Sequence, residues 1–455
     1  MNVLFLSTMA WDETGGTYAP TRLALELASR GHRVAFLEHR RSETRDTRGL
    51  NISIAGLEEF GVHPLAVMLA WRGVPLGALT EIFPRIEKWL DETFAANEPR
   101  IVVLNSPFAP FAQLLAFLQT RGAWCVYYAQ DDYAAMFALG MNQFNPRLED
   151  YLVTRADLNL ALAEPVAKKL ARSGRNVELV PDAVEPREFQ NATHLPANVL
   201  RGAECTLGMW GSLIAPMVDA ELVRALAQAK PQWAINLLGP YEPVPQAYSV
   251  YEPLAEFPNV RFHGRVPHAE LKNYARAFDV CLIPAPDNEM SRGRDPIKLY
   301  EYLACYKPVV ATHMPQLQGI PYVHIASGAQ QAITEIERAR QEHVEPRVLD
   351  EFLKQHTWSQ RADTFLELTA RMVQQPRGRY GAFDAAELEQ IADAQPIARL
   401  EAREWQQLLA VLGEHAHLKT DLSRLEQWAH ELERANRAHE TSVTARFRKF
   451  IPTLK

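Results

Sequence analysis

The sequence predicts an α/β protein in which two consecutive domains each contain a parallel β-sheet covered by helices, with a helical tail after them. The first observation is length, because 455 residues exceed the roughly 250–300 residues that one hydrophobic core supports. The second is a repeated alternation of short apolar segments with helical segments, which is typical of doubly wound parallel sheets. The third is a change of pattern after residue 375, where apolar residues adopt a heptad spacing.

The first domain is predicted over residues 1–190. Val3–Ser7 and Val34–Glu38 are short apolar segments of the kind buried in a parallel sheet, and the helix between them places Leu23 and Leu27 on one face. Together they form a βαβ unit, so the domain is expected to be Rossmann-like. Further strands are expected at Ile101–Asn105, Cys125–Ala129, Asn159–Ala163 and Val177–Pro181.

A second Rossmann-like domain follows a linker. Residues 191–204 show no periodicity and are predicted to join the two domains. The second domain is predicted over residues 205–375, with helices between Val348 and Gln375 at its end and a cleft facing the first domain. Its expected strands lie in the segments CTLGMWG, WAINLLG, VRFHG, VCLIP, PVVAT and YVHIA, which begin at Cys205, Trp233, Val260, Val280, Pro308 and Tyr322.

The tail, residues 376–455, is predicted to be helical and to end in a basic, aromatic segment. A heptad seam favours self-association or docking to a partner protein, and one amphipathic helix packed on the body is the alternative. The terminal segment ARFRKFIPTLK fits a foot on an anionic membrane surface, and equally a solvated terminus. The seam consists of Leu408, Val411, Leu418, Leu422, Leu425, Ala429 and Leu432, with His415 and Asn436 as polar interruptions.

Composition narrows the function classes. A net charge of −7 argues against general nucleic-acid binding, which requires a basic face. The four cysteines lie far apart and form no CxxC pair, which indicates buried thiols in a reducing compartment. The N-terminus lacks a basic segment, and no run of about 18 uncharged apolar residues occurs. The expected location is cytoplasmic. The basic, aromatic end of the tail leaves open a peripheral position at the inner face of the cell membrane.

The segment Arg294–Thr312 is the most informative for chemistry. Asp295 is a good N-cap ahead of a helix in which Lys298 and Glu301 lie on one face. A helix N-terminus with Arg294 and Lys298 beside it attracts a diphosphate, and Glu301 one turn later is placed to accept the hydroxyls of a ribose. The alternative is a surface pair of Lys298 with Glu301 on an ordinary sheet-covering helix.

The same segment resembles a known family. Its pattern Pro-x-Lys-x-x-Glu-Tyr-Leu-Ala is similar to the donor-site motif of retaining GT-B glycosyltransferases of group 1 (family 4), in the branch active in capsule, teichuronic-acid and O-antigen assembly. The resemblance covers about residues 1–375 and implies the GT-B fold, with a nucleotide sugar bound to the second domain. Glu301 then holds the ribose. The resemblance also extends to the small-residue turn Gly211-Ser212 and to the base pocket around Gly264 and Arg265.

Three positions depart from the family pattern. Many members carry two glutamates eight positions apart, and the earlier position is Gly293 here, with Glu289 nearby. The usual glycine before Lys307 is Tyr306, and Asp182-Ala183-Val184 replaces a common Asn-Gly-Val. Because of these departures, the identity of the donor sugar stays open. So does the alternative that the protein no longer catalyses the transfer.

Two segments of the first domain are expected to face the cleft. The loop Thr14–Arg22 contains Gly15 and Gly16, which allow close approach of backbone to a phosphate or sugar; a plain turn is the alternative. Asp131 follows a buried strand and is predicted to contact the transferred sugar or the acceptor hydroxyl. The alternative there is a hydrated loop in which Asp132 caps a helix.

Other candidate residues carry less weight. His263 and His268 flank Gly264 and are candidates for lining the cleft, as is His313, although such histidines are more often structural or exposed. No His, Cys and Asp cluster has metal-ligand spacing, so no obligatory metal is expected.

The predicted function is transfer of a sugar from a nucleotide sugar to a growing surface glycan or lipid-linked acceptor. The resemblance implies retention of anomeric configuration, and front-face attack is favoured because no nucleophile is evident. Lys298 and Arg294 would stabilise the departing diphosphate, with Asp131 at the sugar. Two alternatives stay open. One is a nucleotide-sugar 2-epimerase, which turns over without an acceptor, and the other is a nucleotide-sugar-binding scaffold of a polysaccharide assembly complex.

Overall fold

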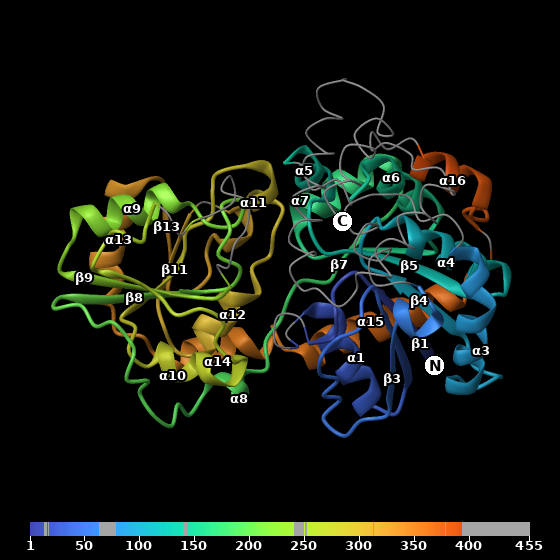
Figure 1. Cartoon of the computed structure of the whole chain (residues 1–455), viewed down its shortest axis with the longest axis horizontal. Coiled ribbons are helices and arrows are strands. Elements are labelled where there is room, and N and C mark those ends of the chain that lie inside the picture. Colours follow the sequence, from blue (N-terminus) through green and yellow to red (C-terminus); the bar gives the residue numbers. More distant parts are fainter. Residues whose placement is uncertain are drawn as a thin grey trace, which may run out of the picture.

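The computed structural model describes residues 1–12, 16, 18–62, 79–139, 144–240, 250, 253–312, 314–377 and 379–393. These residues form two lobes side by side, each with a β-sheet between layers of helices (Figure 1). The predicted heptad seam and the basic terminal segment lie outside the described residues. Within the described part of the chain, no helix is long and apolar enough to cross a membrane.

The first lobe contains a seven-stranded sheet in the order β3-β2-β1-β4-β5-β6-β7, with every neighbouring pair parallel. The central strands are buried along their whole length because helices cover both faces, which explains why they read as continuous apolar runs. The strands are β1 (Asn2–Ser7), β2 (Arg33–Glu38), β3 (Ile52–Gly56), β4 (Arg100–Leu104), β5 (Trp124–Ala129), β6 (Leu158–Ala161) and β7 (Glu178–Leu179).

Helices on the two faces of this sheet build two separate parts of the core. Short helices often begin with proline at the first or second position, where the missing N–H costs nothing. The helices are α1 (Ala19–Ser29), α3 (Phe83–Thr93), α4 (Ala109–Thr120), α5 (Tyr133–Ala138), α6 (Pro146–Arg155) and α7 (Glu164–Leu170), and the 3-10 turns are η2 (Leu57–Phe60), η3 (Leu79–Ile82) and η4 (Ala171–Ser173).

The second lobe contains a six-stranded parallel sheet in the order β10-β9-β8-β11-β12-β13. Its strands are β8 (Cys205–Trp210), β9 (Trp233–Leu238), β10 (Val260–Phe262), β11 (Val280–Ile283), β12 (Val309–Thr312) and β13 (Val323–Ala326). Its helices are α9 (Ala220–Ala229), α10 (Leu271–Ala275), α11 (Glu289–Arg292), α12 (Ile297–Ala304), α13 (Ala329–Ala339) and α14 (Pro346–Lys354), with the turns η6 (His268–Glu270) and η7 (Pro315–Leu317). The short helix α8 (Pro186–Phe189) lies in the connection between the lobes.

The chain crosses between the lobes twice, and the two crossings touch. The backbone N–H of Val184 donates to the carbonyl of His356 over 3.0 Å. Arg361, near the start of the helix that follows the second crossing, donates to the carbonyls of Pro181 and Asp182. The first crossing is therefore tied to that helix. The two segments therefore support each other where the lobes are joined.

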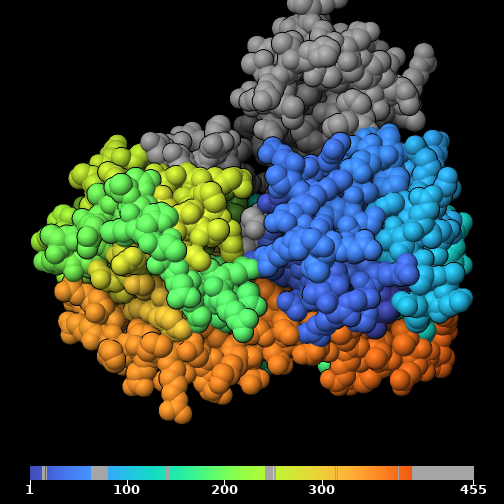
Figure 2. All heavy atoms as spheres, turned by 90° about the horizontal axis from the view of Figure 1, so that it is seen from below, coloured from blue at the N-terminus to red at the C-terminus, as the bar shows by residue number. Residues whose placement is uncertain are grey.

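The last helices return to the first lobe. α15 (Trp358–Val373) packs beside α1 and contributes Ala362, Phe365 and Leu368 to the core on that face. This differs from the sequence analysis, which placed residues up to 375 in the second domain, because an apolar helical face does not reveal which sheet it covers. α16 (Ala385–Asp393) then packs on α4 and α6. In Figure 2 the orange residues, which end at residue 393, run along both lobes.

Candidate active site

The candidate active site lies where the end of β8 meets α12 and where the segment after β5 meets the loop before that helix. Parallel sheets bind ligands at the carboxyl ends of their strands, because loops and helix N-termini converge there. Arg294, Lys298 and Glu301 come from α12 and the loop before it, and Asp131 comes from the opposite lobe. The structure therefore brings together the four side chains to which the sequence assigned chemistry.

Lys298 lies against the turn that follows β8. A Cβ atom built on Gly211 would be 2.7 Å from the Lys298 Nζ, so the absence of a side chain there makes room for the ammonium group. Burial, and after it the neighbouring Arg294 guanidinium, lowers the pKa of Lys298 to about 7, although Glu301 acts in the opposite direction. A lysine and an arginine held this close together, each only partly exposed, favour an anionic ligand.

Three glycines stand side by side at the ends of β8, β9 and β10. The Gly211 N–H donates to the Leu238 carbonyl, and the Gly239 N–H donates to the Gly264 carbonyl over 2.8 Å. A Cβ on Gly239, whose φ is 148°, would lie 1.9 Å from the Gly211 carbonyl oxygen. Only glycine allows this close approach, and Gly239 is a component of the edge that the sequence analysis did not single out.

Glu301 is buried, with both carboxylate oxygens engaged. Its Oε2 accepts from the Trp210 Nε1 over 2.6 Å, and its Oε1 lies 3.1 Å from the His268 Nε2. The Tyr302 hydroxyl accepts the Trp210 backbone N–H, which joins α12 to the end of β8. The interpretation of Glu301 as a partner of Lys298 on an exposed helix surface does not describe this environment.

Arg294 reaches the other lobe. Its Nε lies 3.5 Å from the Asp131 Oδ1, and both side chains are about a quarter exposed. Burial raises the pKa of Asp131 and Asp132 raises it further, while Arg294 opposes the shift. Asp131 is thus a carboxylate at the interface between the lobes that pairs with a cation from the loop before α12.

Asp132 has a structural role. Its Oδ1 accepts from the Ala135 N–H as the N-cap of α5, and Lys169 donates to both carboxylate oxygens. The same Lys169 pairs with Glu289 of the second lobe over 3.1 Å. Glu289, which the sequence analysis noted near the position of the family's earlier glutamate, is thus part of an ion pair between the lobes.

Gly293 lies against the first lobe. A Cβ built there would be 2.8 Å from the Asp132 Cβ and 3.4 Å from a Val166 methyl carbon. The absence of a glutamate at this position therefore coincides with close packing of the two lobes.

Asp295 does not cap α12, contrary to the sequence prediction. The helix begins after Pro296 without a side-chain cap. The Asp295 carboxylate instead accepts from the Asp182 backbone N–H over 2.8 Å and from the Tyr300 hydroxyl. Burial raises its pKa to about 6, and burial with the Asp295 charge raises that of Asp182. The pair joins the two lobes next to the helix N-terminus.

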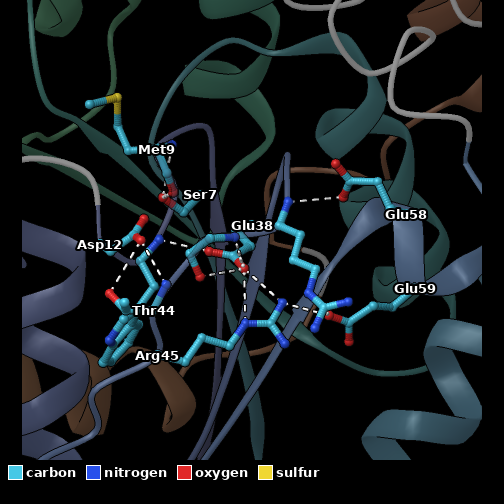
Figure 3. Close-up of polar contacts among 11 residues, drawn as sticks. Ser7, Met9, Asp12, Glu38, Thr44, Arg45, Glu58 and Glu59 are labelled. Carbon is cyan, nitrogen blue, oxygen red and sulfur yellow. Dashed lines mark hydrogen bonds and ion pairs between the residues drawn. The ribbon is translucent and has the colours of Figure 1, made fainter. Parts of the chain in front are cut away.

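The loops at the edge of the first sheet are held by Glu38 (Figure 3). Its buried carboxylate accepts from the Trp11 N–H over 2.7 Å, from the Ser42 N–H and hydroxyl, and from Arg45. Asp12 accepts from the Thr44 N–H in the same network. The loops after β1 and β2 are therefore fixed to each other, and the sequence analysis did not recognise Glu38 as their anchor.

The remaining predicted residues lie as follows. Gly16 has φ of 73° and open space around a built Cβ, as expected of a turn, whereas Gly15 and His313 lie outside the described residues. Ser212 and Arg265 are exposed beside Gly211 and Gly264. No group of three or more His, Cys, Asp or Glu side chains in the described part of the chain is arranged to hold a metal ion.

Comparisons with known proteins agree with this architecture. Residues 14–183 match the glycosyl transferase 4-like domain, and residues 205–338 match the glycosyl transferases group 1. A sucrose-phosphate synthase from Thermosynechococcus elongatus shares the fold with a TM-score of 0.60 at 15% identity, over 82% of this chain and 99% of that one. HepE of Anabaena, solved in complex with UDP-glucose, gives a TM-score of 0.53 at 16% identity, over 86% of this chain and 98% of that one.

Residues 14–183 and 205–338 are therefore glycosyltransferase domains, of the 4-like and the group 1 type respectively, and the chain has the GT-B fold. Among curated proteins it is similar to one from Bacillus subtilis (strain 168), provisionally named teichuronic acid biosynthesis glycosyltransferase TuaH. The two are 30% identical over 167 residues, which are 36% of this chain and 41% of that relative.

Proposed function

We propose that the protein transfers a sugar from a nucleoside-diphosphate sugar to a glycan or lipid-linked acceptor at the interface between the two lobes. The observation that carries the proposal is the close approach of the Lys298 ammonium group to Gly211. Lys298 lies beside Arg294 and one helical turn from the buried Glu301. A diphosphate needs cations and N–H donors, and a ribose needs a hydrogen-bond acceptor one step further along the ligand. These groups occur here in that order.

Each residue has a role in this proposal. Lys298 and Arg294 stabilise the negative charge that develops on the departing diphosphate, and the N-terminus of α12 adds its dipole. Glu301 accepts the ribose hydroxyls. Asp131, on the opposite lobe, contacts the transferred sugar or the acceptor hydroxyl. The donor phosphate takes the proton from the acceptor hydroxyl as that oxygen attacks the sugar from the same face, which retains the anomeric configuration. We propose that the reaction needs no metal, because Lys298 and Arg294 would supply the positive charge that neutralises the diphosphate.

The acceptor is proposed from relatives. HepE binds UDP-glucose and the Bacillus protein is named for teichuronic acid biosynthesis, so a UDP-sugar donor and a cell-surface glycan acceptor are the first choices to test.

The test is thermal stabilisation of the purified protein by UDP, GDP, TDP and their sugars, with Glu301→Ala beside the wild type. A ligand that binds only the folded state at a hundredfold excess over its Kd adds about 2.7 kcal/mol to the free energy of unfolding. We expect a shift with one nucleotide that is much smaller in Glu301→Ala. No shift with any nucleotide would refute the donor site.

A further inference from the structure

The orientation of the Glu301 carboxylate is set by donors from outside α12. Trp210, at the end of β8, donates to Oε2 over 2.6 Å, and His268, from the loop after β10, lies 3.1 Å from Oε1. Glu301 is 4% exposed, so water contributes little to its solvation. A carboxylate offers about four lone-pair positions, so two remain for two ribose hydroxyls once these contacts are made.

One aromatic ring supports both donors. Phe189 of α8 meets the His268 ring edge to face, with centroids 5.1 Å apart and an interplanar angle of 90°. The same Phe189 lies parallel to Trp210, with centroids 6.5 Å apart. The His268 side chain is only 15% exposed, so its ring has little freedom to leave Glu301. The connection between the lobes thus determines where both donors stand.

We propose that His268 is a positioning residue for ribose recognition, acting through Glu301. It fixes the rotation of the carboxylate so that the two free lone pairs face the 2′- and 3′-hydroxyls of the nucleotide. This inference rests on the proposed function, because it assumes that Glu301 receives the ribose. It predicts that removal of His268 weakens the binding only of nucleotides that carry both hydroxyls, and only while Glu301 is present.

The experiment measures Kd by calorimetry for UDP, GDP, ADP and CDP, and for the 2′,3′-dideoxy form of each nucleotide that binds. For His268→Ala we expect about tenfold weaker binding of the ribonucleotide, the effect of one lost hydrogen bond to a charged group. Binding of the dideoxy nucleotide should change less than about twofold, as should binding of either nucleotide when His268→Ala is added to Glu301→Ala.

Two further variants separate hydrogen bonding from packing. His268→Gln keeps a donor and is expected to recover most of the affinity, whereas His268→Phe keeps the contact with Phe189 and should behave like His268→Ala even if the alanine variant folds poorly. The matched control is His194→Ala, because His194 and Glu270 form a similar pair at 3.3 Å on the exposed surface of the same lobe. The control should bind like the wild type.

The outcomes are distinct. Equal losses for ribose and dideoxy nucleotides, or no loss in His268→Ala and His268→Phe, overturn the role of His268 and leave the proposed function standing. Absence of binding by the wild type to all four nucleotides overturns this inference, and absence of stabilisation by TDP as well overturns the proposed function.

Discussion

If a nucleoside diphosphate binds beside Lys298 as proposed, the pKa of this lysine makes nucleotide affinity depend on pH. A lysine normally titrates near 10.5, and burial beside Arg294 lowers the pKa of Lys298 to about 7. The free protein therefore has a neutral Lys298 above pH 7 and a charged one below it. A bound diphosphate favours the charged form, so binding above pH 7 requires uptake of a proton and weakens as pH rises.

The magnitude follows from that pKa. If the bound diphosphate keeps Lys298 protonated throughout, the apparent Kd rises by a factor of 1 + 10^(pH − 7), which is about 11 at pH 8 and about 100 at pH 9. Lys298 is partly exposed, and solvent screening makes these values upper limits. At pH 8 about 0.9 proton is taken up for each nucleotide bound.

Calorimetry with UDP between pH 7 and pH 9, in two buffers of different ionisation enthalpy, measures both quantities. The range avoids the terminal phosphate, whose own pKa is about 6. Lys298→Arg should bind with a flat pH profile because arginine stays charged, and Lys230→Arg, at a partly exposed ion pair with Glu337, should keep the wild-type profile. A wild-type Kd that is constant over this range, without proton uptake, would refute the reasoning.

Three further predictions concern the same edge of the fold. Gly211→Ala forces a side chain into a φ of 125° and toward the Lys298 Nζ, so the free energy of unfolding should fall by about 1–3 kcal/mol and UDP should bind more weakly, both measurable by thermal melts; unchanged values would contradict the contact. Asp131→Asn removes the charge that competes for Arg294, so UDP should bind several-fold more tightly while sugar transfer falls about a hundredfold or more, and unaltered UDP affinity would argue against this competition. Glu38→Ala leaves its buried donors without an acceptor and should cost about 3–5 kcal/mol in urea unfolding, a loss below 1 kcal/mol being inconsistent with the network.

The sequence predicted most of the fold because buried parallel strands carry a strong local signal. The strand expected at Val34–Glu38 is observed at Arg33–Glu38, and the one at Ile101–Asn105 is observed at Arg100–Leu104. β3 was not predicted. It lies at the edge of the sheet with its first three residues only partly buried, so its sequence lacks the continuous apolar run of the central strands.

The site was predicted in its residue types more than in its contacts. A helix with Lys298 and Glu301 on one face follows from spacing, which is a local property. The seat of Lys298 on Gly211 depends on how two distant segments meet. The capping prediction for Asp295 failed because the carboxylate accepts a backbone N–H from the other lobe, a competition that no local rule contains.

The contacts between the lobes join the two halves of the proposed chemistry. Asp131 and Lys169 belong to the first lobe, while their partners Arg294 and Glu289 belong to the second. Gly293 permits these pairs, since a side chain there would collide with the segment that carries Asp131 and so hold the lobes apart. Separating the lobes would remove the acceptor-side carboxylate from the donor-side cation. In the proposed mechanism, the packing of the lobes at Gly293 is therefore what allows the sugar, its diphosphate and the acceptor to be held together.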